Sequence, residues 1–152
     1  MKKIYIFILI TFCLFITGCS SNKVKEAKTL QNFEETCNNN GFDTADNLIN
    51  YTDKEITGSI IAKIDNEQIE MVIYDSEESA KKVQDGHIND FMSIRNNLVN
   101  VKKEKGKNYY SFKMVTNGYY WVSTRIDNTL IFTKIPVDYK EKIDTILDNL
   151  NY

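Results

Sequence analysis

Five aromatic and basic side chains in the second half of the chain have the types that binding chemistry uses. They are Tyr109, Lys113, Tyr119, Trp121 and Arg125. Tyr and Trp rings stack against flat ligand groups and keep a polar edge for hydrogen bonds. A Lys or Arg beside such a ring makes a cation–π contact or holds an anion. If all five share one open face of a sheet, the sequence predicts a surface that binds a glycan, a peptide or another protein.

The turn at residues 116–118 decides whether these side chains share a face. We expect a three-residue turn over Thr116, Asn117 and Gly118, with Gly118 left-handed in a bulge. This register collects the remaining apolar residues of both strands on a single inner face. A two-residue Asn-Gly turn would instead pair Met114 with Trp121 and leave apolar residues on both faces. The alternative to a binding surface is that the rings pack under a loop, under the last helix or across the sheet, because aromatic residues are favoured in strands in any case.

Few residues suit catalysis or metal binding. His87 is the single histidine, and no second histidine or cysteine accompanies it at the spacing of a zinc site or a catalytic triad. The acids between Asp43 and Glu55 lack the ligand spacing and the glycine of an EF-hand loop. No glycine-rich phosphate loop or nucleophile elbow is present. We therefore expect no metal, no cofactor and no enzymatic activity.

The first residues of the chain have the pattern of a secretory signal. Lys2 and Lys3 precede an apolar run from Ile4 to Ile16, which Thr11 alone interrupts. This run is too short for a transmembrane helix, which needs roughly 20 apolar residues. We expect cleavage of residues 1–18.

Residues Ile16-Thr17-Gly18-Cys19 resemble the lipobox of bacterial lipoproteins, with Ile16 where leucine is commonest. The resemblance implies cleavage between Gly18 and Cys19 and a diacylglyceryl thioether on Cys19, with further acylation, for example by palmitate. It places the protein at the extracytoplasmic face of the cell membrane, with the lipid membrane as its first partner. The alternatives are an ordinary signal peptide followed by a coincidental cysteine, or an uncleaved hydrophobic anchor.

As a whole, the chain resembles the small, uncharacterised lipoproteins of Gram-positive bacteria. Those proteins share no established activity, so the resemblance implies no functional residue beyond Cys19. We expect a non-enzymatic module that binds a ligand or an envelope protein, peptide or glycan. A small cell-envelope enzyme and a structural homo-oligomer are the alternatives.

Composition limits the remaining possibilities. The whole chain has a net charge of −2, and removal of Lys2 and Lys3 with the signal leaves −4, which disfavours a nucleic-acid partner. After lipidation of Cys19, Cys37 has no partner for a disulfide, and we expect it to be a buried thiol. We expect a flexible tether over residues 19–28 and one globular domain over residues 29–152.

Periodicity predicts the elements that position these residues. Three helices are expected over residues 29–39, 76–98 and 138–150, the first capped by Thr29 and the second by Asp75. Five strands are expected, near residues 56–64, 108–115, 119–126 and 129–135, with another, containing Ile69, Met71 and Ile73, that follows the first across Asp65-Asn66 as a two-residue turn. Residues 42–53 have no clear period. The predicted fold is α+β, in the order α-β-β-α-β-β-β-α, with the helices on one face of a mainly antiparallel sheet.

Overall fold

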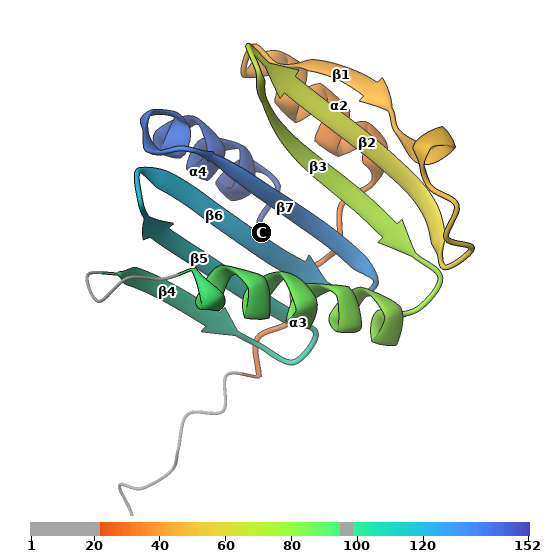
Figure 1. Cartoon of the computed structure of the whole chain (residues 1–152). Helices are drawn as coiled ribbons and strands as arrows, with labels where there is room; N and C mark the ends of the chain where they lie inside the picture. The colour runs from red at the N-terminus through yellow and green to blue at the C-terminus, as the bar shows by residue number, and fades with distance from the viewer. Residues whose placement is uncertain (1–21, 95–98) are drawn as a thin grey trace, which may run out of the picture.

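The structure, a computed structural model, describes residues 22–94 and 99–152 and has three layers (Figure 1). A central sheet has helix α3 on one face and helices α2 and α4 on the other. The elements in chain order are α2 (Leu30–Asn39), β1 (Asp43–Asp46), η1 (Leu48–Asn50), β2 (Ile56–Ile64), β3 (Glu67–Tyr74), α3 (Glu77–Ser93), β4 (Asn100–Lys105), β5 (Tyr109–Thr116), β6 (Tyr119–Ile126), β7 (Thr129–Pro136), η2 (Val137–Tyr139) and α4 (Lys140–Asn149).

Seven antiparallel strands form the sheet, in the order β1-β2-β3-β7-β6-β5-β4. The predicted five-stranded sheet and its element order are therefore wrong, although the α+β class is as expected. The two missed strands, β1 and β4, lie at the two edges of the sheet and are mostly exposed. Edge strands are commonly short and charged, because charge discourages pairing with other chains, so they lack the apolar alternation that marks a strand in sequence.

Both faces of the sheet are buried, which corrects our expectation of helices on one face. On one side, Phe33 of α2 and Ile143 of α4 join a core with Ile131 of β7. On the other side, Phe91 of α3 packs with Phe112 and Met114 of β5. A sheet with apolar residues on both faces needs a helical layer on each, and the chain supplies both.

The hairpin of β2 and β3 confirms its predicted register. Ile60 pairs with Met71 and Ala62 with Ile69. Asp65 has a φ of 54°, in the left-handed region that a tight turn requires. The first helix also begins as predicted, because the side chain of Thr29 accepts a hydrogen bond from the backbone N–H of Asn32.

The turn between β5 and β6 differs from the prediction. Asn117 and Gly118 both have positive φ, 52° and 79°, and they form a two-residue turn closed by the pair Thr116 and Tyr119. Met114 consequently pairs with Trp121. Two left-handed residues match the twist of a hairpin, and Asn-Gly is the favoured sequence for this turn. The predicted three-residue turn is wrong because both faces of this sheet, and not one, accept apolar side chains.

Helix α3 begins one residue later than predicted, at Glu77, and its N-cap is Ser76. The Oγ of Ser76, and not the carboxylate of Asp75, accepts the hydrogen bond from the Ser79 N–H at 3.1 Å. The helix ends at Ser93, and residues 95–98 of the predicted helix lie outside the described residues.

Part of the predicted tether is attached to the domain. The backbone N–H of Lys25 donates to Asn108 Oδ1 at 3.0 Å, and Asn108 Nδ2 donates back to the Lys25 carbonyl at 2.8 Å. The N–H of Lys107 donates to the Lys23 carbonyl at 2.9 Å. The backbone of residues 23–25 is thus held against residues 107–108. The predicted signal peptide, Gly18 and Cys19 lie outside the described residues. In the part that is described, no helix is both long and apolar enough to cross a bilayer.

Candidate functional site

The two-residue turn separates the five residues that we predicted to share a face. Tyr109 and Lys113 lie on the face covered by α2 and α4, whereas Tyr119, Trp121 and Arg125 lie on the face covered by α3. The single aromatic surface therefore does not form.

Three of the five side chains already have contacts within the fold. Tyr109 is buried and donates its hydroxyl hydrogen to Glu104 Oε1 at 2.8 Å. Trp121 meets the ring of Phe91 edge-on, with centroids 4.9 Å apart. Arg125 is 6% exposed, and its Nη1 donates to Glu77 Oε1 at 2.9 Å and to the carbonyl of Asp127 at 2.8 Å. Tyr109 and Arg125 also line a cavity of about 520 Å³ beside α3. Lys113 lines two cavities on the other face, between α4 and strands β4 and β5.

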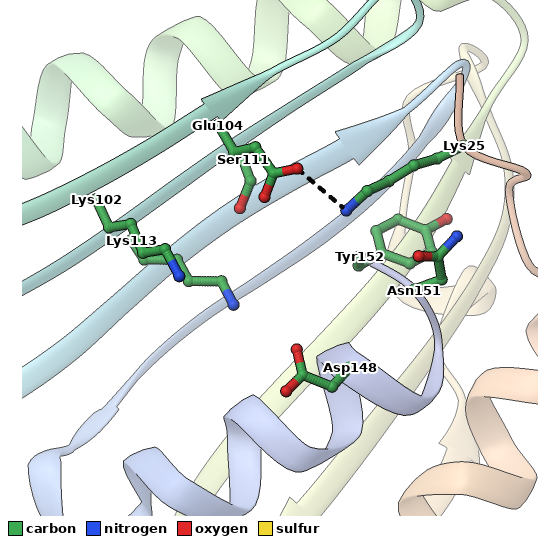
Figure 2. Close-up of a pocket in the computed structure, with 8 residues that line it drawn as sticks. All are labelled: Lys25, Lys102, Glu104, Ser111, Lys113, Asp148, Asn151 and Tyr152. Atoms are coloured by element: carbon green, nitrogen blue, oxygen red, sulfur yellow. Dashed lines mark ion pairs between the residues drawn. The ribbon is translucent and has the colours of Figure 1, made fainter. Parts of the chain in front are cut away.

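We define the lysine groove as the hollow between α4 and strands β4 and β5 (Figure 2). Two adjoining cavities of about 160 and 290 Å³ form it, and both are lined by Lys102, Lys113 and Asp148. The walls also include Lys25, Glu104, Tyr120, Lys140, Asp144 and Tyr152.

The strand wall of the groove concentrates positive charge. Lys102 of β4 and Lys113 of β5 are direct cross-strand partners and point to the same side (Figure 2). Like charges directly opposite each other in a sheet are destabilising. Lys113 relieves part of this repulsion, because its Nζ lies 3.3 Å from Asp144 Oδ1.

The helix wall carries Lys140, Asp144 and Asp148 at intervals of four residues, which places them on one side of α4. Asp144 Oδ1 accepts a hydrogen bond from the Tyr120 hydroxyl at 2.6 Å, and its Oδ2 lies 2.6 Å from Lys140 Nζ. Burial alone would raise the pKa of Asp144. Its bonds to Lys140 and Tyr120, together with the charge of Lys113, outweigh burial and lower that pKa. Asp144 is thus a fixed negative charge.

A second ion pair closes one end of the groove. Lys25 Nζ lies 4.0 Å from Glu104 Oε1 and 4.6 Å from the centre of the Tyr109 ring. The hydrogen bond from Tyr109 lowers the pKa of Glu104, and the charge of Lys25 acts in the same direction. Tyr152 borders this end, and burial raises the pKa of its hydroxyl to about 12. Its hydroxyl bonds to Thr129.

Two charged side chains of the groove have no ion-pair partner among the described residues, although the charge of Lys102 helps to lower the pKa of Glu104. Within residues 22–94 and 99–152, no ion pair includes Lys102 on the strand wall or Asp148 on the helix wall. Both side chains are exposed, and Asp148 points from α4 into the space beside the strands (Figure 2). The groove therefore offers a cation and an anion on opposite walls, an arrangement suited to a ligand with both charges.

Sequence reasoning found Lys113 but missed Lys102, Asp144 and Asp148. Lys102 is in the unrecognised edge strand β4, so nothing in the sequence brought it beside Lys113. The four-residue spacing of Lys140, Asp144 and Asp148 can be read from the sequence. The strands that these side chains face cannot. The described residues contain no group of three or more potential metal-ligating side chains. Cys37 is buried, and burial raises the pKa of its thiol to about 12.

Comparison with known proteins adds little about ligands. No family model and no curated protein matches this chain. It is similar to a crystal structure described as a GTP binding regulator from Thermotoga maritima, with 18% sequence identity and a TM-score of 0.46. The similarity covers 88% of this chain and 95% of that chain. At this level of similarity, function has to be inferred from the residues of the chain itself.

Proposed function

We propose that this protein is a lipoprotein, anchored to the outer side of the cell membrane through Cys19, whose domain binds a ligand without transforming it. The lipobox residues Ile16 to Cys19 and the preceding apolar run support the anchor. Four residue steps separate Cys19 from Lys23, which allows a reach of roughly 14 Å at about 3.5 Å per step. Because Lys25 lines the lysine groove, the groove lies close to the bilayer.

The ligand that the groove fits is a short peptide segment with one anionic and one cationic group. The observation that carries this proposal is that Lys102 and Asp148, on opposite walls, have no ion-pair partner among the described residues. A peptide carboxylate would be attracted to Lys102 and Lys113, and an ammonium group to Asp148. The exposed polar lining gives specificity for charge and not for bulk apolar surface.

The acids of the groove favour binding over catalysis. A general acid needs a carboxyl group that keeps its proton near neutral pH, which requires a raised pKa. The pKa values of Asp144 and Glu104 are instead lowered by their hydrogen bonds and cationic neighbours. Such carboxylates are suited to holding cations and poorly suited to the role of a general acid at neutral pH.

Tetra-alanine, which has a free ammonium group and a free carboxylate, is a suitable probe for the groove. We expect it to shift the NMR signals of Lys102 and Asp148 in the full chain in detergent, whereas its N-acetylated amide does not. The double variant Lys102→Gln/Asp148→Asn should bind about tenfold more weakly, as expected for two lost charge-assisted bonds that are partly screened by water.

The matched control is Lys103→Gln/Glu141→Gln, which makes the same charge changes on the same two elements outside the groove. This control should bind tetra-alanine as the wild type does. Equal weakening in both double variants, or equal binding of the blocked peptide, would contradict the proposal.

The anchor is tested separately. Cys19→Ser should abolish incorporation of labelled palmitate and release the protein from membranes, whereas Cys37→Ser should change neither. Persistent labelling of the Cys19→Ser protein would show that the lipobox assignment is wrong.

A further inference from the structure

A buried carboxylate lies on the face of the sheet opposite the lysine groove. Glu70 of β3 is 4% exposed and faces the α3 layer. Its Oε1 accepts hydrogen bonds from Ser59 Oγ at 2.6 Å, Tyr51 OH at 2.8 Å and Asn47 Nδ2 at 2.7 Å. Within residues 22–94 and 99–152, it has no ion pair with a Lys or Arg. A buried carboxylate usually has a cation beside it, because burial without one is costly.

Glu70 lines a cavity of about 370 Å³ beside α3, which we call the Glu70 pocket. Phe132 of β7 is the cross-strand neighbour of Glu70, and His87 and Phe91 reach the cavity from α3. The rings of His87 and Phe132 are 4.6 Å apart, and His87 stacks on Phe91 at 6.1 Å. The volume is in the range of small-molecule sites, which are typically about 300–1,000 Å³ and lined by aromatic groups with few polar atoms.

The second oxygen of the carboxylate is available to a ligand. All three hydrogen bonds to Glu70 end on Oε1, whereas an ionised carboxylate accepts about four across both oxygens. The three donors are neutral, so they orient Glu70 without cancelling its charge. Nearby, His87 Nδ1 is buried and has no hydrogen-bond partner among the described residues.

The lysine that lines the pocket, Lys134, contacts aromatic rings. Lys134 Nζ lies over the rings of Trp121 and Tyr119, at 4.7 and 4.9 Å from their centres. Among the described residues, no lysine or arginine therefore forms an ion pair with Glu70. Aromatic faces carry partial negative charge and add to the attraction for a cation.

We propose that the Glu70 pocket is a second binding site, which takes a small organic molecule with a primary ammonium group on an apolar or aromatic body. The ammonium group donates to Glu70 Oε2, and the body lies among Phe91, Phe132 and His87. An anionic ligand is repelled by Glu70. A neutral apolar ligand leaves the buried charge unpaired and gains nothing from it.

Phenethylamine, which is protonated at pH 7, and its neutral counterpart 2-phenylethanol test this proposal on the full chain in detergent. Phenethylamine should shift the NMR signals of Glu70, Phe91 and Phe132, with an affinity roughly tenfold or more above that of 2-phenylethanol. Glu70→Gln should remove this preference, because glutamine keeps the oxygen that accepts from Ser59 and loses the charge. Glu67→Gln is the matched control, since Glu67 lies on the same strand but on the opposite face, and it should bind as the wild type.

If Glu70→Gln does not fold, the wild-type comparison of the two probes still decides the question, and Phe132→Leu should weaken phenethylamine severalfold. Equal affinity for the amine and the alcohol, shifts mapped outside the pocket, or no binding at millimolar amine would each overturn the proposal. Binding gained only in Lys134→Met would also overturn it, because Lys134 would then be the natural partner of Glu70. The groove variant Lys102→Gln/Asp148→Asn should leave phenethylamine binding unchanged, so the two sites are tested independently.

Discussion

Asp144 and Glu70 lie on opposite faces of the sheet, and each accepts three hydrogen bonds, but their donors differ in charge. Asp144 receives Tyr120 and two lysines, Lys113 and Lys140, beside an open groove. Glu70 receives three neutral donors in a buried position. The two lysines beside Asp144 more than offset its negative charge, whereas the three neutral donors of Glu70 do not offset the charge of that carboxylate. The number of hydrogen bonds therefore does not show whether a buried charge is satisfied.

The largest expected effect distinguishes the two carboxylates by stability. Glu70→Ala should lower the free energy of unfolding by about 3 kcal/mol, because buried donors such as Ser59 lose their acceptor and a void remains. Asp144→Ala should cost only about 1 kcal/mol, since water enters the groove and replaces its partners. Urea denaturation of the full chain in detergent measures both. A larger loss for Asp144→Ala than for Glu70→Ala would reverse the comparison.

The next prediction concerns the pH dependence of stability, which should differ between His87 on one face of the sheet and Asp144 on the other. Burial lowers the pKa of His87, although the charges of Asp90 and Glu70 act against this. The unfolded chain therefore takes up a proton first, and stability falls as pH drops below the ordinary histidine value of 6.5. The slope for one proton is at most about 1.4 kcal/mol per pH unit. The lowered pKa of Asp144 contributes stability that is lost only below its ordinary value of 3.8.

Unfolding measured from pH 8 to pH 2 follows both losses of stability. His87→Met should remove the upper step and leave the lower, whereas Asp144→Asn should reduce the lower step, to which Glu104 also contributes, and leave the upper. Loss of both steps in one variant would mean that the two faces do not titrate separately.

The interior strands were predictable from sequence, but the edges were not. Alternation along Ile60 and Ala62 and the Asp65-Asn66 turn determined the β2–β3 hairpin, because one buried face allows only one register. Strands β1 and β4 bury little, so their sequences carry no period. At Gly118, the assumption of one inner face favoured the wrong turn, whereas the local Asn-Gly preference indicated the right one.

The candidate sites depend on contacts between distant parts of the chain, and the sequence alone does not show which residues come together. Lys113 was recognised as a binding residue, but its neighbour Lys102 belongs to a strand with no apolar signal. Glu70 alternates with Ile69 and Met71, a pattern typical of a solvent-facing acid. It is buried because α3 and the segment around Tyr51 cover that face. The positions of such covering segments come from tertiary packing and not from the local pattern.

The smallest expected effect on stability tests whether the repulsive pair Lys102 and Lys113 serves ligand binding. Lys102→Glu places an acid directly opposite Lys113 and should raise the free energy of unfolding by about 0.5 kcal/mol, because an opposite-charge cross-strand pair replaces a like-charge one. The same variant should abolish tetra-alanine binding, since the strand wall no longer attracts a carboxylate. Lys103→Glu, one residue away and opposite Phe112, should leave binding unchanged. A substitution that stabilises the domain and removes its ligand would identify the Lys102–Lys113 repulsion as a cost retained for function. If Lys102→Glu stabilises the chain and still binds the peptide, the groove is not the site.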